Sequence, residues 1–358
     1  MDRIPKTMQA AVYRGPNDIR LETLPVPRIG SNELLVKVAV CGVCPTDIKK
    51  IHYGTVPPPR VFGHETSGTI VRTGAQVRGF VVGERVALHH HIPCMECHYC
   101  KHRAFAQCET YKRTGITAGF EPAGGGYAEY VRVLPCVFRG VVKIPRRNTF
   151  LEGAMLEPVN TVLKGVRRLG LLPGDNALVV GVGPIGLMFT RLLTLEGVRV
   201  FASDLVQRRL KLARKFGANV LLDAADPNLG EKLLKSAGKQ GLDAAVICAP
   251  VDAAVQQAQD LVHGAGKVLL FAHTKRGQKA PVDLAAICVD EKDLIGSYSA
   301  DVTLQKEVAR LVFDRLLPVQ SLITHRFPLA QTKAAVDLAA HPTAESLKVV
   351  VEQGVFGG

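Results

Sequence analysis

Val179-Val180-Gly181-Val182-Gly183-Pro184-Ile185-Gly186 forms a G-x-G-x-x-G pattern near the middle of the chain. It follows a short apolar run, Asn176 to Val180, and opens a segment of helical spacing that extends to Glu196. Glycines permit a tight turn and let the backbone approach a pyrophosphate, which rests on the unpaired amides of a helix N-terminus. The pattern therefore predicts a dinucleotide-binding turn, with Gly181, Gly183, Pro184 and Gly186 at the cofactor.

The next predicted strand, Val198 to Ser203, leads directly to Asp204, which stands eighteen residues after Gly186. A carboxylate at this place accepts hydrogen bonds from the ribose hydroxyls of adenosine. Because the same carboxylate would repel a 2′-phosphate, the sequence favours NAD over NADP. Arg208 and Arg209 argue in the opposite direction, since two adjacent arginines tolerate a phosphate.

Strands and helices continue to alternate after Asp204, which indicates a parallel sheet with right-handed crossovers. The predicted elements are a helix at Gln207 to Phe216 and strands at Ala244 to Cys248, Lys267 to Phe271 and Leu294 to Ile295. Residues 8–145 differ, because short β-branched runs alternate there with Gly, Pro and Asn, as is typical of an antiparallel β-domain. These runs are Leu34 to Val40, Thr69 to Val71, Arg85 to Leu88 and Ala128 to Val133.

The segment after Gly296 no longer fits parallel crossovers, so we expect it to return to the first domain. Its predicted elements are helices at about 304–317 and 329–340 and strands at 323–326 and 347–351. The sequence thus predicts an α/β protein of two domains, the usual solution for a chain of 358 residues. Residues 156–296 form a doubly wound Rossmann domain, and residues 1–155 with 297–358 form a mostly β domain.

Composition is that of an ordinary folded protein, with 47% hydrophobic and 22% charged residues. The net charge of +13 comes from scattered residues without a basic run, which favours a solvated surface over nucleic-acid or membrane binding. Met1 to Gly15 carries no apolar block, and the longest apolar stretch, Ala177 to Phe189, is interrupted by proline and glycines. We therefore expect a cytoplasmic protein that binds neither nucleic acid nor membrane.

The chain has nine cysteines, an odd number, and they are clustered unevenly, which is unlike a secreted disulfide framework. Clustered thiols in a reducing compartment indicate metal ligands. Four of them are close in sequence, as Cys94-Met-Glu-Cys97-His-Tyr-Cys100 followed by Cys108. Four thiolates around Zn²⁺ form a closed structural site without room for water or substrate. Buried cysteines or an iron–sulfur ligand set are the alternatives. The cations that could offset the thiolate charge are Lys101, His102, Arg103, Lys112 and Arg113.

The run His89-His90-His91 precedes the four cysteines, at the start of the lobe that we place at about residues 89–113. Neighbouring residues on a strand point to opposite faces, so three consecutive histidines do not converge easily. We interpret them as surface or packing residues.

A second group of metal-binding residue types lies in Gly42-Val43-Cys44-Pro45-Thr46-Asp47 and Gly63-His64-Glu65. Thiolate, imidazole and carboxylate are the ligands of a catalytic zinc that keeps one position open. Cys41 is a competing thiol. For Thr46 and Asp47, an N-cap or Asx-turn role is the alternative.

Taken in order, these motifs resemble the zinc-containing medium-chain dehydrogenases, the superfamily of alcohol, polyol and threonine dehydrogenases. The resemblance runs from Ala10 to Val350, and it is greatest for the sorbitol or iditol dehydrogenase-like branch. The stretches that carry it are Cys44-Pro45-Thr46-Asp47, Gly63-His64-Glu65, Glu157-Pro158 and Ile323-Thr324-His325-Arg326-Phe327-Pro328-Leu329. It implies that the mostly β domain is GroES-like, that two zinc ions bind per chain, and that the protein is a homo-oligomer, either a dimer or a tetramer.

The resemblance assigns Cys44 and His64 to the catalytic zinc. Alcohol dehydrogenases supply a second cysteine where this chain has Leu156-Glu157-Pro158, so the third ligand here is a carboxylate, either Glu65 or Glu157. One thiolate and one carboxylate cancel the charge of Zn²⁺, so we expect one of the two glutamates at the metal at a time.

Further roles follow by the same resemblance. Asp47 would orient the histidine ligand, and Thr46 would hydrogen-bond the substrate oxygen and pass its proton outward. Many relatives have a relay histidine where this chain has Lys49, with His52 nearby, so the proton path is left open. Arg209 would lie along the adenine ribose and Ile185 near the pyrophosphate. Two segments, Phe271 to His273 and Gly296 to Tyr298, would lie near the nicotinamide.

The expected reaction is zinc-assisted hydride transfer from a secondary hydroxyl to NAD, which gives a ketone. The branch favours a polyol, a cyclitol or a sugar, phosphorylated or not, and L-threonine or a general secondary alcohol is the alternative substrate. The alternative from another functional class is a zinc-ribbon-like nucleic-acid-binding protein, but this function does not account for the residues from Gly181 to Asp204. A further alternative is a crystallin-like protein that keeps the fold and has lost catalysis. The presence of Cys44, His64 and Glu157 argues against it.

Overall fold

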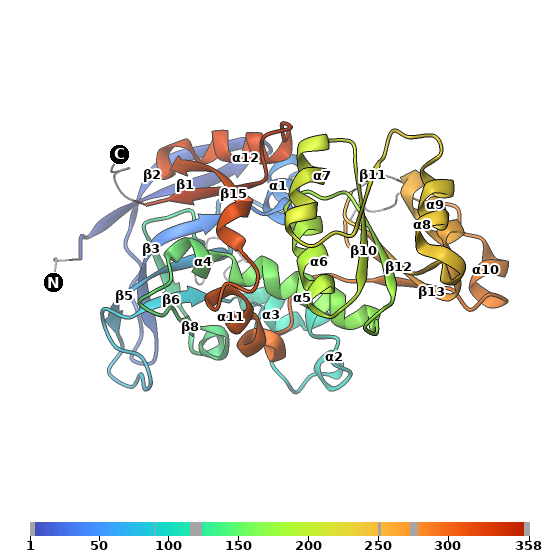
Figure 1. The fold of residues 1–358 in the computed structure, drawn as a ribbon. Coiled ribbons are helices and arrows are strands. Elements are labelled where there is room, and N and C mark those ends of the chain that lie inside the picture. Colours follow the sequence, from blue (N-terminus) through green and yellow to red (C-terminus); the bar gives the residue numbers. More distant parts are fainter. Residues whose placement is uncertain are drawn as a thin grey trace. The chain divides into compact units, whose positions relative to one another are not determined.

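The computed structural model describes residues 4–89, 91–114, 124–249, 252–272, 277 and 279–353 (Figure 1). His90 and His273 lie outside the described residues, as do the side chains of Lys112 and Arg113. The chain divides into two compact units, one of Met1–Asn160 with Ala300–Gly358 and one of Thr161–Ser299. The first division falls inside helix α5 (Leu156–Leu169).

The unit of residues 161–299 is built on a six-stranded sheet whose paired strands are all parallel. In spatial order the strands are β11 (Val220–Asp223), β10 (Arg199–Asp204), β9 (Asn176–Val180), β12 (Leu242–Ile247), β13 (Val262–Leu270) and β14 (Asp293–Gly296). Along the chain, the strands begin at the centre with β9 and proceed through β10 to β11 at one edge. The chain then returns to the centre with β12 and continues to β14 at the other edge, which defines a doubly wound sheet. Cofactors bind such sheets at the carboxyl ends of the central strands, where the order reverses.

Helices cover both faces of this sheet (Figure 1). They are α6 (Pro184–Leu195), α7 (Gln207–Lys215), α8 (Leu229–Ala237), α9 (Asp252–Leu261) and α10 (Leu284–Cys288). Successive side chains of each strand point to opposite faces of the sheet, so an apolar layer forms on each face. In one of these layers Leu178 and Phe201 pack with Leu233 of α8. On the other face Phe189 of α6 meets Phe271 edge to face at 4.9 Å. Burying such a side chain contributes about 1.5–3 kcal/mol.

The other unit contains two sheets among the described residues. A three-stranded sheet has the order β2 (Asp18–Pro25), β1 (Thr7–Gly15), β4 (Arg60–Val61). The larger sheet has the order β15 (Ile323–Pro328), β16 (Lys348–Glu352), β3 (Leu34–Gly42), β5 (Glu65–Thr73), β6 (Arg85–Leu88), β8 (Val142–Lys143), with β7 (Tyr130–Val133) also paired to β3. All pairs are antiparallel except β15 with β16.

Short helices link these strands: α1 (Pro45–Tyr53), α2 (His98–Lys101), α3 (Glu109–Thr114), α4 (Phe150–Ala154), α11 (Gln305–Phe313) and α12 (Thr332–Ala340). The C-terminal strand β16 lies inside the larger sheet, next to the edge strand β15, because it pairs with β3 on one side and β15 on the other. The predicted fold class, a Rossmann sheet with a mostly β domain, is confirmed. The sequence did not reveal β11 or the three-stranded sheet.

No helix of the described residues is long and apolar enough to cross a membrane.

At the amino ends of the parallel strands, Asp243 joins neighbouring segments. One carboxylate oxygen accepts a hydrogen bond from the backbone N–H of Asn176 at 2.7 Å, and the other lies 3.0 Å from Nε2 of His263. The hydrogen bond to Asp243 raises the pKa of His263 above its ordinary value. The stabilisation from this pair is therefore complete below about pH 6.5 and is lost as the pH rises through the raised value.

We expect His263→Ala to lower the free energy of unfolding more at about pH 5.5 than at about pH 8.5. Because the pair is partly exposed, the difference should be only about 0.5 kcal/mol. Urea unfolding of the two proteins at both pH values measures it. An equal loss at both pH values would show that the ion pair contributes nothing.

Candidate metal and cofactor sites

The register of the larger sheet brings one set of strand ends together. β3 ends at Gly42 opposite Glu65, the first residue of β5, and β16 begins beside the same end of β3. β6 runs antiparallel to β5, so that Leu88 at its end lies opposite Thr66. The segments that follow or begin these strands therefore meet at one edge, and they carry the ligand types that the sequence analysis singled out.

Glycines make this meeting possible. A Cβ added at Gly42 would lie 1.8 Å from Oε2 of Glu65, so the glutamate side chain occupies the space that any other residue would need. Gly63, the residue before His64, has a φ of +97°. A Cβ there would lie 2.7 Å from Sγ of Cys41. Both glycines are thus required by close packing beside the candidate ligands.

Cys44 is the N-cap residue of α1, with Pro45 in the first turn, where proline is compatible with a helix. Its Sγ lies 2.7 Å from Oγ1 of Thr46, so the hydroxyl of Thr46 is held at the thiol. Cys41, the competing thiol, is buried in the apolar core, and Thr66 Oγ1 donates to its sulfur at 3.4 Å. Burial raises the pKa of Cys41 to about 12, which keeps it a neutral thiol and a poor metal ligand.

His64 and Asp47 form a buried pair in which Nδ1 of the imidazole lies 3.2 Å from Oδ2 of the carboxylate. Although burial alone would raise the pKa of Asp47, the neighbouring imidazole and the N–H of Gly63 lower it below its ordinary value. A carboxylate at Nδ1 fixes the tautomer and the orientation of the ring. The other ring nitrogen, Nε2, is then the one suited to a metal.

Glu65 has a partner that the sequence did not reveal. Lys348, at the start of β16, donates from Nζ to Oε1 of Glu65 at 2.6 Å and to the carbonyl oxygen of Val43 at 3.0 Å, and it also contacts Oε2. Both side chains are almost fully buried. A single lysine before the apolar run Val349 to Val351 was the only signal in the sequence.

Glu157, in the first turn of α5, lies beside a residue that we had interpreted as surface or packing. Its Oε1 is 3.2 Å from Nδ1 of His91. His91 and His89 are both buried, with ring centres 5.6 Å apart, and the ring of His91 also lies 5.1 Å from that of Tyr111, tilted by 56°. Of the two interpretations of these histidines, packing therefore fits His89 and His91, and a surface position does not. Burial, with the charge of Glu65, raises the pKa of Glu157 to about 7.

Lys49, at the position of the relay histidine in many relatives, is half-buried on α1, and burial lowers its pKa below the ordinary value. His52 is on the last turn of the same helix, with its ring 6.2 Å from that of His341.

The donor set fits a zinc ion. Ligand atoms of Cys44, His64 and Glu65 all lie within 4.8 Å of one another, and Glu157 lies outside that group. A thiolate, an imidazole and carboxylates are typical zinc ligands, and fewer than four of them leave a position for substrate. The structure thus brings together the two segments that the sequence placed at one metal, while the role of each residue stays a prediction.

The four-cysteine lobe has the dimensions of a closed zinc site. All four sulfurs lie within 4.8 Å of one another, with Cys97 and Cys100 at 3.5 Å and Cys94 and Cys100 at 3.9 Å. Four sulfurs at about 2.3 Å from a tetrahedral ion are about 3.8 Å apart. Backbone N–H groups of Glu96 and Cys97 lower the pKa of Cys94 to about 6, which favours the thiolate. Cys108 accepts from the N–H of Cys94 at 3.3 Å.

The glycine-rich turn has three glycines with three different surroundings. Gly181 has a φ of +84°, and a Cβ at Gly186 would lie 2.0 Å from the carbonyl oxygen of Gly181. At Gly183, the N-cap of α6, a Cβ would meet nothing within 4 Å. The first glycine makes the turn, the third allows the helix to pack on the strand, and the second leaves open space at the helix N-terminus. This arrangement fits a pyrophosphate.

Asp204, at the end of β10, is tied to this turn. One carboxylate oxygen accepts from the N–H of Val182 at 2.8 Å, and the other accepts from the N–H of Val206 at 2.8 Å. A carboxylate has about four lone-pair directions, so two hydrogen bonds leave acceptor capacity for ribose hydroxyls. Arg209 follows on the first turn of α7 and is partly buried, whereas Arg208 is exposed.

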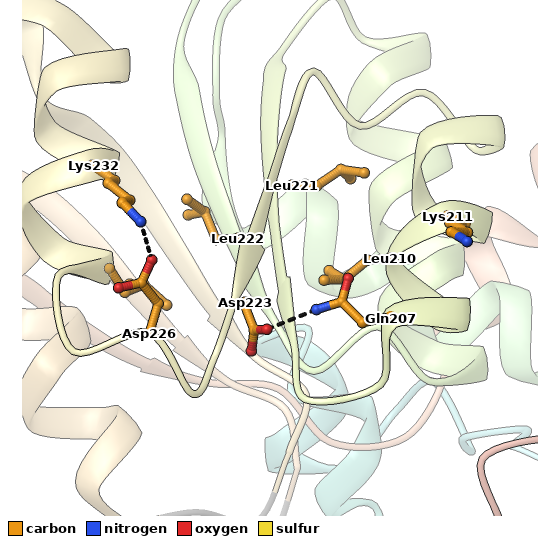
Figure 2. Close-up of a pocket in the computed structure, with 9 residues that line it drawn as sticks. Gln207, Leu210, Lys211, Leu221, Leu222, Asp223, Asp226 and Lys232 are labelled. Carbon is orange, nitrogen blue, oxygen red and sulfur yellow. Dashed lines mark hydrogen bonds and ion pairs between the residues drawn. The ribbon is translucent and has the colours of Figure 1, made fainter.

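A cavity of about 420 Å³ lies elsewhere on this unit, between α7, β11 and the start of α8 (Figure 2). Leucines form part of its wall, Gln207 donates to Asp223 at 2.7 Å, and Lys232 pairs with Asp226. None of the residues from Gly181 to Gly186 lines it. It is therefore separate from the glycine-rich turn.

Comparisons with known proteins show the family of the chain. Residues 30–146 match the model of the "Alcohol dehydrogenase GroES-like domain", and residues 184–316 match that of the "Zinc-binding dehydrogenase". A sorbitol dehydrogenase of Bombyx mori is 31% identical over 353 residues, which cover 96% of this chain and 98% of that protein. D-arabinitol dehydrogenase 1 of Uromyces fabae is 30% identical, with 98% of each chain covered.

A solved structure from Sinorhizobium meliloti 1021, described as a zinc-binding dehydrogenase bound to NADP, has a TM-score of 0.87 and 28% identity. The match covers 97% of this chain and 100% of that one. The chain therefore belongs to the zinc-binding dehydrogenases of the medium-chain superfamily, and the resemblance found in the sequence is confirmed. It is an oxidoreductase of the alcohol and polyol dehydrogenase type that uses zinc and a nicotinamide cofactor.

We expect two zinc ions per chain by metal analysis of the purified protein and about one in Cys100→Ser, because three thiolates no longer close the lobe. Cys136→Ser is the matched control, since Cys136 is exposed and belongs to neither cluster. Unchanged zinc content in Cys100→Ser would contradict the structural site.

Proposed function

We propose that the protein oxidises a secondary hydroxyl of a polyol, cyclitol or sugar, phosphorylated or not, to a ketone with NAD as hydride acceptor. The observation that carries the proposal is the convergence of Cys44, His64 and Glu65 at one edge of the larger sheet, in a chain that also has the glycine-rich turn. These three residues belong to the part predicted at 1–155 and 297–358, and the cofactor-binding residues belong to the part predicted at 156–296. Glu157, the other candidate ligand, stands at the start of that second part.

Bound at Cys44, His64 and a glutamate, zinc supplies a Lewis acid that lowers the pKa of a hydroxyl. NAD⁺, held at Gly181, Gly183 and Asp204, would supply the hydride acceptor, so that overall R₂CHOH and NAD⁺ give R₂C=O, NADH and one proton. The chain's own residues position and carry that proton. Thr46, held by its hydroxyl at Sγ of Cys44, accepts it from the substrate and passes it outward. Asp47 keeps Nε2 of His64 directed to the metal.

The relatives support the substrate class, because two of them are dehydrogenases of sorbitol and D-arabinitol. Asp204 supports NAD, since its carboxylate would face the 2′-position, where NADP carries a phosphate. Gly181, Gly183, Pro184, Ile185 and Gly186 are the residues that we assign to the pyrophosphate, with Arg209 along the ribose. We assign a structural zinc to Cys94, Cys97, Cys100 and Cys108.

We also infer a homo-oligomer, either a dimer or a tetramer, in the cytoplasm. None of the nine cysteines is paired in a disulfide, which supports a reducing compartment. Light scattering of the purified protein measures the oligomer.

We expect NADH production from at least one member of a panel of polyols, cyclitols, sugars and sugar phosphates. Cys44→Ser should lower kcat/KM on that substrate by about 10³-fold or more, because a main ligand of the Lewis acid is lost. Turnover of L-threonine or of simple secondary alcohols alone would favour the alternative dehydrogenases. Full activity of Cys44→Ser would refute the assigned site.

NAD should be preferred to NADP by about tenfold or more in kcat/KM, which corresponds to about 1.4 kcal/mol. Asp204→Asn should narrow this ratio, because it removes the charge that repels a 2′-phosphate while keeping an acceptor for Val182. Steady-state kinetics with both cofactors measure it. The NADP arm is essential because the Sinorhizobium meliloti structure holds NADP.

A further inference from the structure

Helix α2 of the four-cysteine lobe carries two histidines that neither candidate zinc site uses (Figure 1). Cys97 is the N-cap residue of this helix and Cys100 lies within it, and both belong to the group of four sulfurs. His98 and the C-cap residue His102 are exposed, and they belong to neither group of metal-ligating side chains. The helix thus presents thiols to the sulfur cluster and imidazoles to solvent.

The two histidines are neighbours on one face of the helix. They are four residues apart, and the backbone N–H of His102 donates to the carbonyl oxygen of His98 at 3.3 Å, as in a regular α-helical turn. Side chains at positions i and i+4 of a helix lie next to one another. The ring centres of the two imidazoles are accordingly 4.6 Å apart, with the ring planes tilted by 53°.

This separation fits two ligands of one metal ion. A metal–nitrogen bond of about 2.0–2.1 Å puts the centre of an imidazole ring about 3.2 Å from the ion. Two rings on neighbouring positions of a square-planar or octahedral ion, about 90° apart, have their centres about 4.5 Å apart. On a tetrahedral ion the centres would be about 5.2 Å apart. The observed 4.6 Å is closer to the first value, which describes the geometry that Cu²⁺ and Ni²⁺ prefer.

Both imidazoles are accessible to an incoming ion. Neither has a hydrogen bond or an ion pair with another residue that the structure describes. Lys101 and Arg103 are exposed in the same segment, and their charges disfavour a cation. Four thiolates around a zinc ion leave two net negative charges in the lobe, however, and these offset the two cations.

We propose that His98 and His102 form a third metal site, on the surface of the four-cysteine lobe, for a divalent transition metal such as Ni²⁺ or Cu²⁺. The imidazoles supply two neighbouring ligands and water supplies the others, so the bound ion stays exchangeable, unlike an ion in a closed site of four thiolates. The inference is independent of the proposed reaction, because neither histidine belongs to the catalytic or the cofactor site.

Nickel binding to the zinc-loaded protein without an affinity tag tests the proposal, since Ni²⁺ does not oxidise thiols. Isothermal titration calorimetry should show a Ni²⁺ ion bound to each chain, and metal analysis afterwards should show unchanged zinc content. His98→Ala and His102→Ala should each weaken nickel binding about tenfold or more, because a single imidazole no longer chelates the ion.

His341→Ala is the matched control. His341 is exposed and also has a second histidine beside it, His52, but their ring centres are 6.2 Å apart, which is too far for two ligands of one ion. This variant should bind nickel as tightly as the wild type.

The zinc content of every variant is measured before the titration, because both histidines are close to thiols of the lobe. If an alanine variant contains less zinc than the wild type, His98→Gln or His102→Gln replaces it. Absence of nickel binding by the wild type, unchanged affinity in both variants of the pair, or an equal loss in His341→Ala overturns the proposal. Absence of turnover would refute the proposed function and leave the nickel test intact.

Discussion

The antiparallel register of β3 between β5 and β16 is the constraint on which the candidate metal site depends. It places Gly42 opposite Glu65 and brings the start of β16 to the same edge. A slip of one residue would turn every side chain of a strand to the opposite face of the sheet. Glu65 and Lys348 would then no longer meet, and the loop that carries Cys44 would lose its hydrogen bond from the N–H of Val43 to Val349.

This register also explains how so many ionisable groups are buried together. Each acid lies beside a specific partner: Asp47 beside His64, Glu65 beside Lys348, and Glu157 beside His91. Isolated charges in such surroundings would be strongly destabilising, and paired ones are tolerated.

The two candidate zinc sites differ in how they are assembled. Four thiols from one loop are enough for the first, whereas the second is assembled from strand ends that only the folded sheet brings together.

The sequence predicted those parts of the molecule that are formed by residues close together in the chain. The glycine-rich turn and the strand before it, Asn176 to Val180, could be recognised because turn, strand and helix lie next to one another. The ligand runs at Cys44 and His64 were visible for the same reason. Lys348 was missed because its partner Glu65 is 283 residues away, and a lone lysine before an apolar strand has no local signature. The packing interpretation of His89 and His91 agrees with their burial, but the contact of His91 with Glu157 was missed because the two residues are far apart in the sequence.

Gly42 has a consequence for how such a protein can change over generations. The carboxylate of Glu65 occupies the space where a side chain at position 42 would be. A side chain at position 42 would therefore clash with Glu65 in its present position. A shorter residue at position 65 would relieve the clash but would lose the ion pair with Lys348. Positions 42, 65 and 348 therefore depend on one another, because Gly42 leaves room for the glutamate and Lys348 pairs with its charge.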